Sequence, residues 1–298
     1  MTFLYGYSEK ELDSNLITEL SGYYPIRKCE GQHDSLFVKA HVFLDEQNKC
    51  YLCFVSLDVI GVDSTLRYKV KNKIKENTCE EHFAFDLFLF ATHTHSGPSG
   101  VVDTNKKEKA GLKGIFGEYE NGLEDVLCLI IEKVVRSAKK QMGTFHYSIS
   151  QTEVQDIATD RHHPLKTIDQ LMTVFEMQID TNQTALVNYA CHPTVLSASN
   201  HLLTADFLWE FYKRMSQRFD LISFISGSSA NVSTRFTREN QSFQQAKIFG
   251  QSLHSQYLSK RQYIKKNETL DQLYFLEGSV SLEVKDVSKI SKERVQEV

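Results

Sequence analysis

Two histidines separated by a single residue, His93 and His95, are the first residues in this sequence whose type and spacing suggest chemistry. They follow an apolar, aromatic-rich run of strand length and precede a Gly-Pro turn. Because side chains along a strand alternate between its two faces, these imidazoles would project on the same side, where they could share a metal ion. An isolated pair also fits one packed and one exposed histidine, so other residues must decide between these readings.

A third histidine occupies a comparable place. His192 follows a second apolar run, residues 185–191, and Pro193 comes directly after it. Proline ends the strand and favours an extended conformation of the preceding residue, which fixes the direction of the imidazole. In open α/β sheets, ligands bind where strands end at their carboxyl edge. Three histidines at two strand ends therefore favour a metal site, provided that the two ends meet in the fold.

Two further segments carry candidate polar groups. Arg161 precedes the adjacent His162 and His163. A guanidinium near a metal can hold a substrate anion or a developing oxyanion, whereas adjacent histidines point in different directions and are weak ligand candidates. Ser233 lies in a small-residue loop, 226–238, which could present backbone donors and a nucleophile, or could simply cap a helix. The sequence contains no Gly-x-Ser-x-Gly motif, which disfavours a serine triad without metal.

The hydrophobic patterns around these residues predict the elements that must position them. Residues 36–45 and 51–60 predict a hairpin, and a helix over 63–78 then leads to the strand that delivers His93. Strand, helix and strand in this order indicate a crossover unit. Further helices are predicted over 123–135, 207–215 and 241–262, and further strands over 144–154, 171–179, 185–191, 221–225 and 272–284.

These elements predict an α/β fold, with α+β as the alternative. We expect one domain, residues 1–298, in which a mixed sheet is flanked by helices. The glycine- and lysine-rich residues 99–122 predict a surface loop, although a lid over the histidines is an alternative. The sequence shows no internal repeat.

Composition excludes several classes of protein. A formal net charge of -4 over 298 residues, without a Lys/Arg block, argues against a nucleic-acid groove. The first twelve residues lack the basic and apolar regions of an export signal, and no apolar run approaches the ~18 residues of a membrane span, so we expect a cytoplasmic protein. The six cysteines are expected to be free thiols, including Cys50 and Cys53, which lie within a predicted strand.

Three motifs together resemble the neutral/alkaline non-lysosomal ceramidase family. They are Ala-Thr-His93-Thr-His95-Ser-Gly-Pro, Asn188-Tyr-Ala-Cys-His192-Pro-Thr with Asn200 and Thr204-Ala-Asp206, and Ala230-Asn231-Val-Ser233-Thr-Arg-Phe-Thr-Arg. Their order and spacing fit the N-terminal catalytic region of that family.

The resemblance implies a Zn²⁺-dependent amidase that cleaves the N-acyl bond of ceramide. It implies that His93 and His192 are zinc ligands and that His95 transfers protons beside the metal. Arg161 matches an arginine of the family, and Ser233 occupies the position of the serine usually assigned as nucleophile.

The sequence also departs from the family pattern. Asp160 replaces an asparagine, and Ser233 is followed by Thr-Arg-Phe rather than Pro-Asn, as in shorter bacterial-type members. The family's remaining zinc ligands, a Glu and a Tyr, have no match, and its C-terminal immunoglobulin-like domain is absent. Because catalytic zinc normally takes three protein ligands and a water, either another residue completes the site or the chain binds metal poorly. The candidates for a substitute ligand are His33, Asp34, Asp58 and Asp206.

The sequence thus predicts metal-assisted hydrolysis of an amide in ceramide or a ceramide-like N-acyl lipid. In this hypothesis His95 relays protons, Arg161 stabilises the oxyanion, and Ser233 either attacks the carbonyl or donates to the tetrahedral intermediate. One alternative is a metal-dependent hydrolase of another amide or ester. A second is a non-catalytic relative that keeps the fold and binds a ligand.

Overall fold

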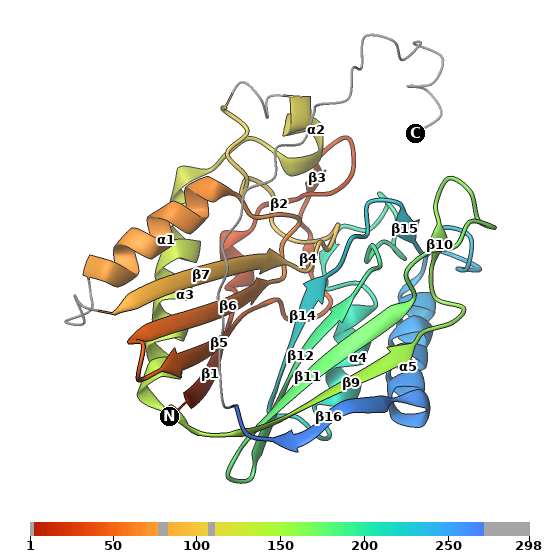
Figure 1. The fold of residues 1–298 in the computed structure, drawn as a ribbon. Coiled ribbons are helices and arrows are strands. Elements are labelled where there is room, and N and C mark those ends of the chain that lie inside the picture. Colours follow the sequence, from red (N-terminus) through yellow and green to blue (C-terminus); the bar gives the residue numbers. More distant parts are fainter. Residues whose placement is uncertain (1–2, 77–82, 107–110, 271–298) are drawn as a thin grey trace.

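Two five-stranded mixed sheets pack against each other between two pairs of helices (Figure 1). The structure is a computed structural model, and it describes residues 3–76, 83–106 and 111–270. The first sheet consists, in spatial order, of β7 (Ala84–Ala91), β6 (Cys50–Leu57), β5 (Phe37–Asp45), β1 (Phe3–Glu11) and β8 (Gly143–Thr144). The second consists of β14 (Leu221–Ser226), β12 (Asn182–Tyr189), β11 (Leu171–Ile179), β9 (His146–Glu153) and β16 (Gln262–Glu268). The fold class is α/β, as the sequence predicted.

Each sheet carries its helices on the outer face. Helices α1 (Ser64–Glu76) and α3 (Asn121–Lys140) pack on each other and on the first sheet, whereas α4 (Leu208–Met215) and α5 (Phe243–Lys260) pack together beside the second. The predicted apolar stripe of α1, formed by Leu66, Val70 and Ile74, is buried as expected. No helix in the described part of the chain is long and apolar enough to cross a membrane.

Short elements occupy the connections between the main strands. They are η1 (Ser14–Leu16), α2 (Lys113–Phe116) and the two-stranded pairs β2 (Glu19–Leu20) with β3 (Arg27–Lys28), β4 (Gly31–Gln32) with β13 (Leu202–Leu203), and β10 (Thr159–Asp160) with β15 (Val232–Ser233). Much of the predicted 99–122 loop is accordingly irregular, with α2 inside it; residues 107–110 lie outside the described part.

The two sheets repeat one topology. In each, the edge strand lies parallel to its neighbour (β7 on β6, β14 on β12), and the remaining neighbours are antiparallel. The order along the chain is also the same in both sheets. One of the two packed helices (α1 or α4) precedes the parallel edge strand, and the other (α3 or α5) follows it. The prediction of no internal repeat is therefore wrong for the topology. The repeat brings two parallel strand pairs, one from each half, to a common crevice.

Most predicted elements are present. The hairpin β5–β6 and the crossover from β6 through α1 to β7 are confirmed. Strands β1 and β16 were not predicted, although Phe3, Tyr5 and Tyr7 alternate along β1 as strand residues do. The predicted strand 272–284 lies outside the described residues. The five described cysteines are free thiols, as expected.

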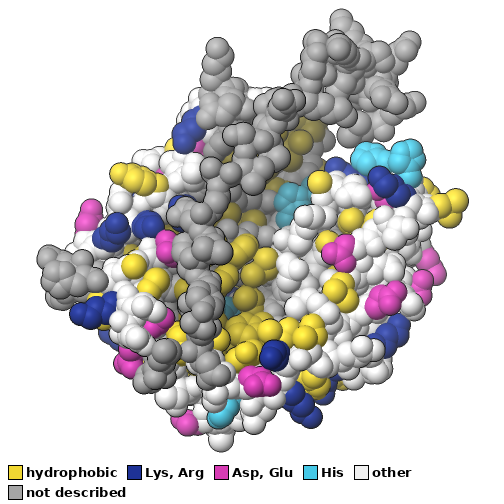
Figure 2. Space-filling view, viewed as in Figure 1, with side chains coloured by type: hydrophobic (Ala, Val, Ile, Leu, Met, Phe, Trp, Pro, Cys, Tyr) yellow, Lys and Arg dark blue, Asp and Glu magenta, His cyan; other side chains and the backbone are white. Residues whose placement is uncertain are grey.

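The inner faces of the sheets meet through aromatic and polar contacts. Aromatic rings such as Phe43 and Phe175 stack between the sheets, and Figure 2 shows apolar side chains gathered in a hollow between the two halves. The Tyr5 hydroxyl of β1 lies 2.7 Å from Nδ1 of His41 and 2.6 Å from Oγ1 of Thr184 in the second sheet. All three residues are fully buried, and burial lowers the pKa of His41 to about 3, so this ring is neutral at pH 7.

We expect Tyr5→Phe to destabilise the protein by about 1–3 kcal/mol, because it leaves His41 Nδ1 and Thr184 Oγ1 buried without their shared partner. Urea unfolding followed by circular dichroism measures this change. Tyr68→Phe is the matched control, since Tyr68 is 71% exposed, and it should leave the unfolding free energy unchanged. Equal stability of the two variants would contradict the importance of this contact between the sheets.

Candidate metal centre and its surroundings

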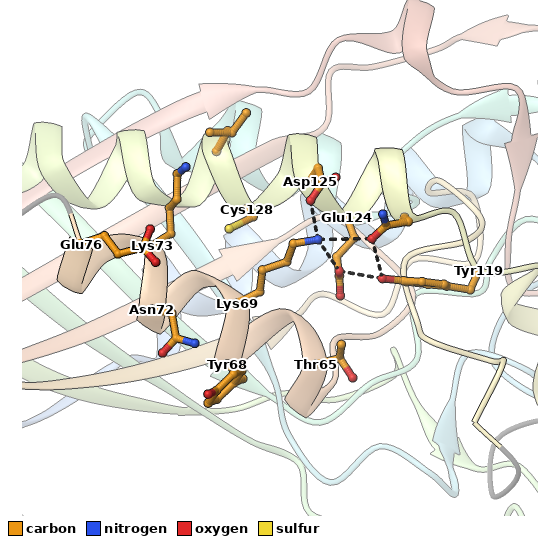
Figure 3. Close-up of a pocket in the computed structure, with 12 residues that line it drawn as sticks. Thr65, Tyr68, Lys69, Asn72, Lys73, Glu76, Tyr119, Glu124, Asp125 and Cys128 are labelled. Atoms are coloured by element: carbon orange, nitrogen blue, oxygen red, sulfur yellow. Dashed lines mark hydrogen bonds and ion pairs between the residues drawn. The ribbon is translucent and has the colours of Figure 1, made fainter.

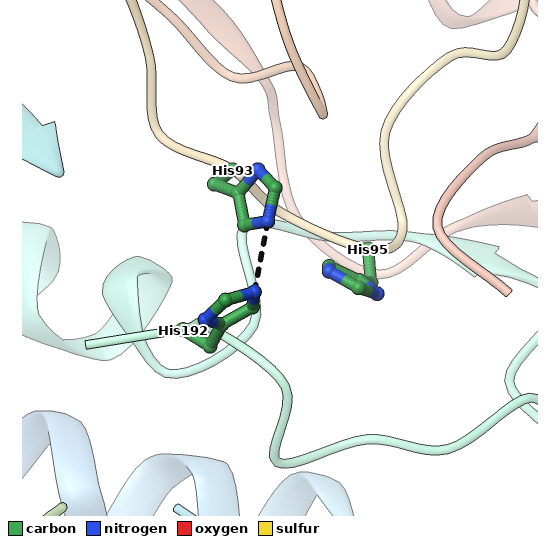
Figure 4. Close-up of side chains that lie close together, drawn as sticks. All are labelled: His93, His95 and His192. Carbon is green, nitrogen blue, oxygen red and sulfur yellow. Dashed lines mark hydrogen bonds between the residues drawn. The ribbon is translucent and has the colours of Figure 1, made fainter. Parts of the chain in front are cut away.

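His93 and His192 come from different halves of the fold and meet edge to face (Figure 4). Their Nε2 atoms are 3.0 Å apart and their ring centroids 4.5 Å apart. The expected meeting of two strand ends is therefore present in the structure.

Backbone carbonyls determine the tautomers of both rings. Nδ1 of His93 lies 2.7 Å from the carbonyl oxygen of Ile60, and Nδ1 of His192 lies 2.6 Å from that of Ser229. Because a carbonyl only accepts hydrogen bonds, each Nδ1 carries the proton and each Nε2 presents a lone pair. Two lone pairs at 3.0 Å repel each other unless a cation lies between them. Two nitrogens bound to one tetrahedral zinc ion would be about 3.3 Å apart, so this donor set fits such an ion.

The backbone delivers His93 in a different way from the one predicted. Strand β7 ends at Ala91, and His93 has a φ of 68°, in the left-handed region that a residue with a Cβ seldom adopts. The amide of His93 donates to the carbonyl of Val59, which ties this turn to the segment after β6. Strand alternation is thus not the reason that His93 and His95 share a side. Such strain commonly occurs at functional sites.

His95 is the third histidine of the cluster. Its ring centroid lies 5.1 Å from that of His93 and 5.6 Å from that of His192, and ligand atoms of all three residues lie within 4.8 Å of one another. Both ring nitrogens of His95 are buried, and neither makes a hydrogen bond of ordinary geometry with a described residue, although an interaction with the backbone of Gly22 favours the protonated ring. The ring can therefore supply a third metal ligand or hold a proton beside the other two.

Residues near the N-terminus, which were not among the predicted site residues, shape the site around His95. A Cβ on Gly22, whose φ is 101°, would lie 2.5 Å from the Cα of His95, so the two backbones approach closely only because Gly22 has no side chain. The Tyr23 ring packs edge-on at 5.0 Å from the imidazole, and the buried Arg27 donates to the carbonyl of His95. A Gly-Tyr-Tyr-Pro turn at residues 22–25 was the available signal.

Burial keeps the three imidazoles neutral. It is the main cause that lowers the pKa of His93, His95 and His192, the last to about 4. The positive charge of Arg161 lowers the pKa of His93 and His192 further. Since the neutral imidazole is the form that binds metals, the cluster is prepared for a cation at pH 7.

The structure brings Ser233 and Arg161 to the same place. Strand β15 pairs with β10, and Ser233 also forms a parallel bridge with His192. The backbone amide of Arg161 donates to the carbonyl of Asn231, two residues before Ser233, over 2.7 Å. Ser233 is buried and its Oγ accepts a hydrogen bond from the amide of Arg235. The backbone therefore places Ser233 and Arg161 beside the segment that carries His192.

The proposed substitute ligands lie elsewhere. Both carboxylate oxygens of Asp206 accept backbone amides, and Asp34 accepts the amide of Ala205 while bonding to Nδ1 of His33. Asp58 accepts the backbone amide of Phe37 across the hairpin over 2.9 Å. None of the four belongs to the described metal-ligand cluster, so they do not replace the family's Glu and Tyr.

Two other predicted features also lie apart from the cluster. His162 and His163 are exposed, in keeping with their weak claim as ligands.

A groove of about 660 Å³ between α1 and α3 contains none of the clustered histidines (Figure 3). Lys69 crosses it to bind Glu124 at 2.9 Å and also pairs with Asp125. This groove therefore offers an internal ion-pair network rather than a metal site.

Comparison with known proteins agrees with this geometry. The family model for the N-terminal region of neutral/alkaline non-lysosomal ceramidases matches residues 16–209. Neutral ceramidase A from Dictyostelium discoideum is 24% identical over 218 residues, which are 65% of this chain and 29% of that protein.

Two solved structures share the fold. A ceramidase complexed with C2 superposes with a TM-score of 0.70 at 16% identity, covering 87% of this chain and 44% of that one. The neutral ceramidase of Pseudomonas aeruginosa gives a TM-score of 0.69 at 16% identity, covering 87% and 45%. The chain thus spans less than half the length of these relatives.

We expect His93→Ala and His192→Ala each to weaken the binding of Zn²⁺ at least about a hundredfold, because even the loss of an outer-shell partner of a ligand can cost this much. Competition with a chromophoric chelator measures the affinity. The exposed His162→Ala and His163→Ala are matched controls and should bind as the wild type does. Unchanged affinity in both cluster variants would remove the metal site.

Proposed function

Because this chain belongs to the neutral/alkaline non-lysosomal ceramidase family, we propose that it is a Zn²⁺-dependent hydrolase that cleaves the N-acyl bond of ceramide or a ceramide-like lipid. The observation that carries the proposal is the opposed pair of Nε2 atoms of His93 and His192, 3.0 Å apart. His192 is buried and His93 is half-buried, both rings are neutral, and carbonyls fix both, which is an arrangement that suits a cation.

His93 and His192 would hold the metal, with His95 beside them. A bound zinc ion supplies a Lewis acid that polarises a carbonyl and acidifies water. His95 makes no hydrogen bond of ordinary geometry through its ring nitrogens with a described residue, so it could take a proton from the attacking group and return it to the leaving amine. Its burial holds the pKa well below the ordinary value, which keeps the ring ready to accept that proton.

Arg161 and Ser233 complete the proposed chemistry. The permanently charged guanidinium of Arg161, whose field reaches both His93 and His192, would stabilise the negative charge that develops on the carbonyl oxygen. Ser233, in register with His192, would either attack the carbonyl carbon or donate a hydrogen bond to the tetrahedral intermediate.

A second candidate is a member that binds metal and ligand without turnover. It is favoured by the composition of the cluster, in which the described residues supply three histidines and no carboxylate. Catalysis by the zinc-loaded chain separates the two candidates.

We expect the zinc-loaded protein to release fatty acid from N-acyl sphingosines, and Ser233→Ala and His95→Ala each to lower kcat/KM by about 10²-fold or more. Chromatographic detection of the released fatty acid measures the rate, and short N-acyl amines test whether the substrate is a lipid. Ser199→Ala, at an exposed serine, is the control and should retain full activity. A wild type that binds zinc but turns over none of these amides would establish the non-catalytic alternative.

A further inference from the structure

Asp160 and Asn231 form a partly buried hydrogen bond beside the strand pair that carries Ser233. Oδ2 of Asp160 accepts from Nδ2 of Asn231 over 2.7 Å, and its Oδ1 accepts the amides of His162 and His163 over 2.9 and 3.0 Å. Asp160 is 2% exposed, and the bond from Asn231 is the main cause that holds its pKa near 2. The carboxylate is therefore charged, and both of its oxygens accept hydrogen bonds.

Asn231 belongs to the loop that supplies most of the backbone contacts of the site. In this loop the carbonyl of Ser229 accepts Nδ1–H of His192, and the carbonyl of Asn231 accepts the amide of Arg161. The carbonyl of Val232 accepts the amide of His192, and Ser233 follows directly. A displacement of this loop would change the tautomer of His192 and the places of Arg161 and Ser233 together.

Few bonds among the described residues join the loop to the segment that carries Arg161: the amide of Arg161 donates to the carbonyl of Asn231, and the hydroxyl of Thr237 donates to the carbonyl of Ile157. Strands β10 and β15 pair over two residues each, so their ladder contains few backbone hydrogen bonds. The side-chain bond between Asp160 and Asn231 adds a charge-assisted link next to that ladder.

We propose that Asp160 and Asn231 are a positioning pair that fixes the 229–233 loop, and through it the tautomer of His192 and the placement of Arg161 and Ser233. Neither residue is catalytic, because each acts through its neighbours. An effect of this pair on kcat/KM rests on the proposed hydrolase function, whereas its effect on the tautomer of His192 does not.

The direction of the bond can be reversed, which gives a specific test. In Asn231→Asp two carboxylates would face each other where donor and acceptor are now 2.7 Å apart, whereas in Asp160→Asn the Asn231 amide can rotate so that its Oδ1 accepts from the new amide. In the double variant D160N/N231D, Nδ2 of the new asparagine can donate to the new carboxylate, and its Oδ1 can still accept both backbone amides. The Asn231→Asp variant should therefore fail, and the double variant should recover.

The primary measurement is the 15N chemical shifts of the His192 ring in metal-free, histidine-labelled protein, with the signal assigned by its loss in His192→Ala. We expect the Nδ1–H tautomer in the wild type and in D160N/N231D, and a tautomer mixture in N231D. In the zinc-loaded enzyme we expect kcat/KM to fall about 10²-fold in N231D, the cost of a small misplacement, and to return to within about threefold in the double variant.

A second Asp–Asn pair provides the matched control. In the β5–β6 turn, Nδ2 of Asn48 donates to Oδ2 of Asp45 over the same 2.7 Å. Variants D45N, N48D and their double swap should change thermal stability without altering the His192 ring shifts or kcat/KM. The proposal is overturned if N231D keeps the wild-type tautomer, or if the double swap leaves His192 as altered as N231D does. Absence of turnover in the wild type would refute the hydrolase function alone, because the ring shifts are read without metal or substrate.

Discussion

The site depends on one electrostatic constraint, the approach of two unprotonated imidazole nitrogens to 3.0 Å. Such an approach is unfavourable in the absence of a cation, and it persists because carbonyls of Ile60 and Ser229 hold the protons on the opposite sides of the two rings. Those carbonyls lie in loops that follow β6 and β14, so the loops determine the chemistry of the rings. The duplicated topology explains why this is possible, because it ends two parallel strand pairs at the same crevice.

Backbone hydrogen bonding distinguishes the acids from the histidines near this crevice. The carboxylates that sequence reasoning offered as ligands are engaged by backbone amides; Asp206, for example, holds the turn into α4. Burial of the imidazoles instead disfavours their charged forms, and this leaves neutral donors at pH 7. The acids therefore support the loops, and the histidines remain available for a metal.

The sequence was sufficient to predict the α/β class, the β5–β6 hairpin, the crossover to β7 and the residues of the cluster, because hydrophobic periodicity and strand-end histidines are local signals. It gave the wrong reason for the histidine pair, since His93 lies beyond β7 in a left-handed conformation that alternation does not describe. The Asp160–Asn231 bond was not predictable, because it joins side chains 71 positions apart. The repeat was also missed, since it preserves strand order without preserving sequence.

The central claim is that His93 and His192 share one metal ion. X-ray absorption at the zinc K edge, recorded on protein loaded with one equivalent of Zn²⁺, tests it most directly. The account predicts imidazole multiple scattering from at least two nitrogens at about 2.0–2.1 Å. A shell of oxygen ligands without an imidazole signature would contradict it.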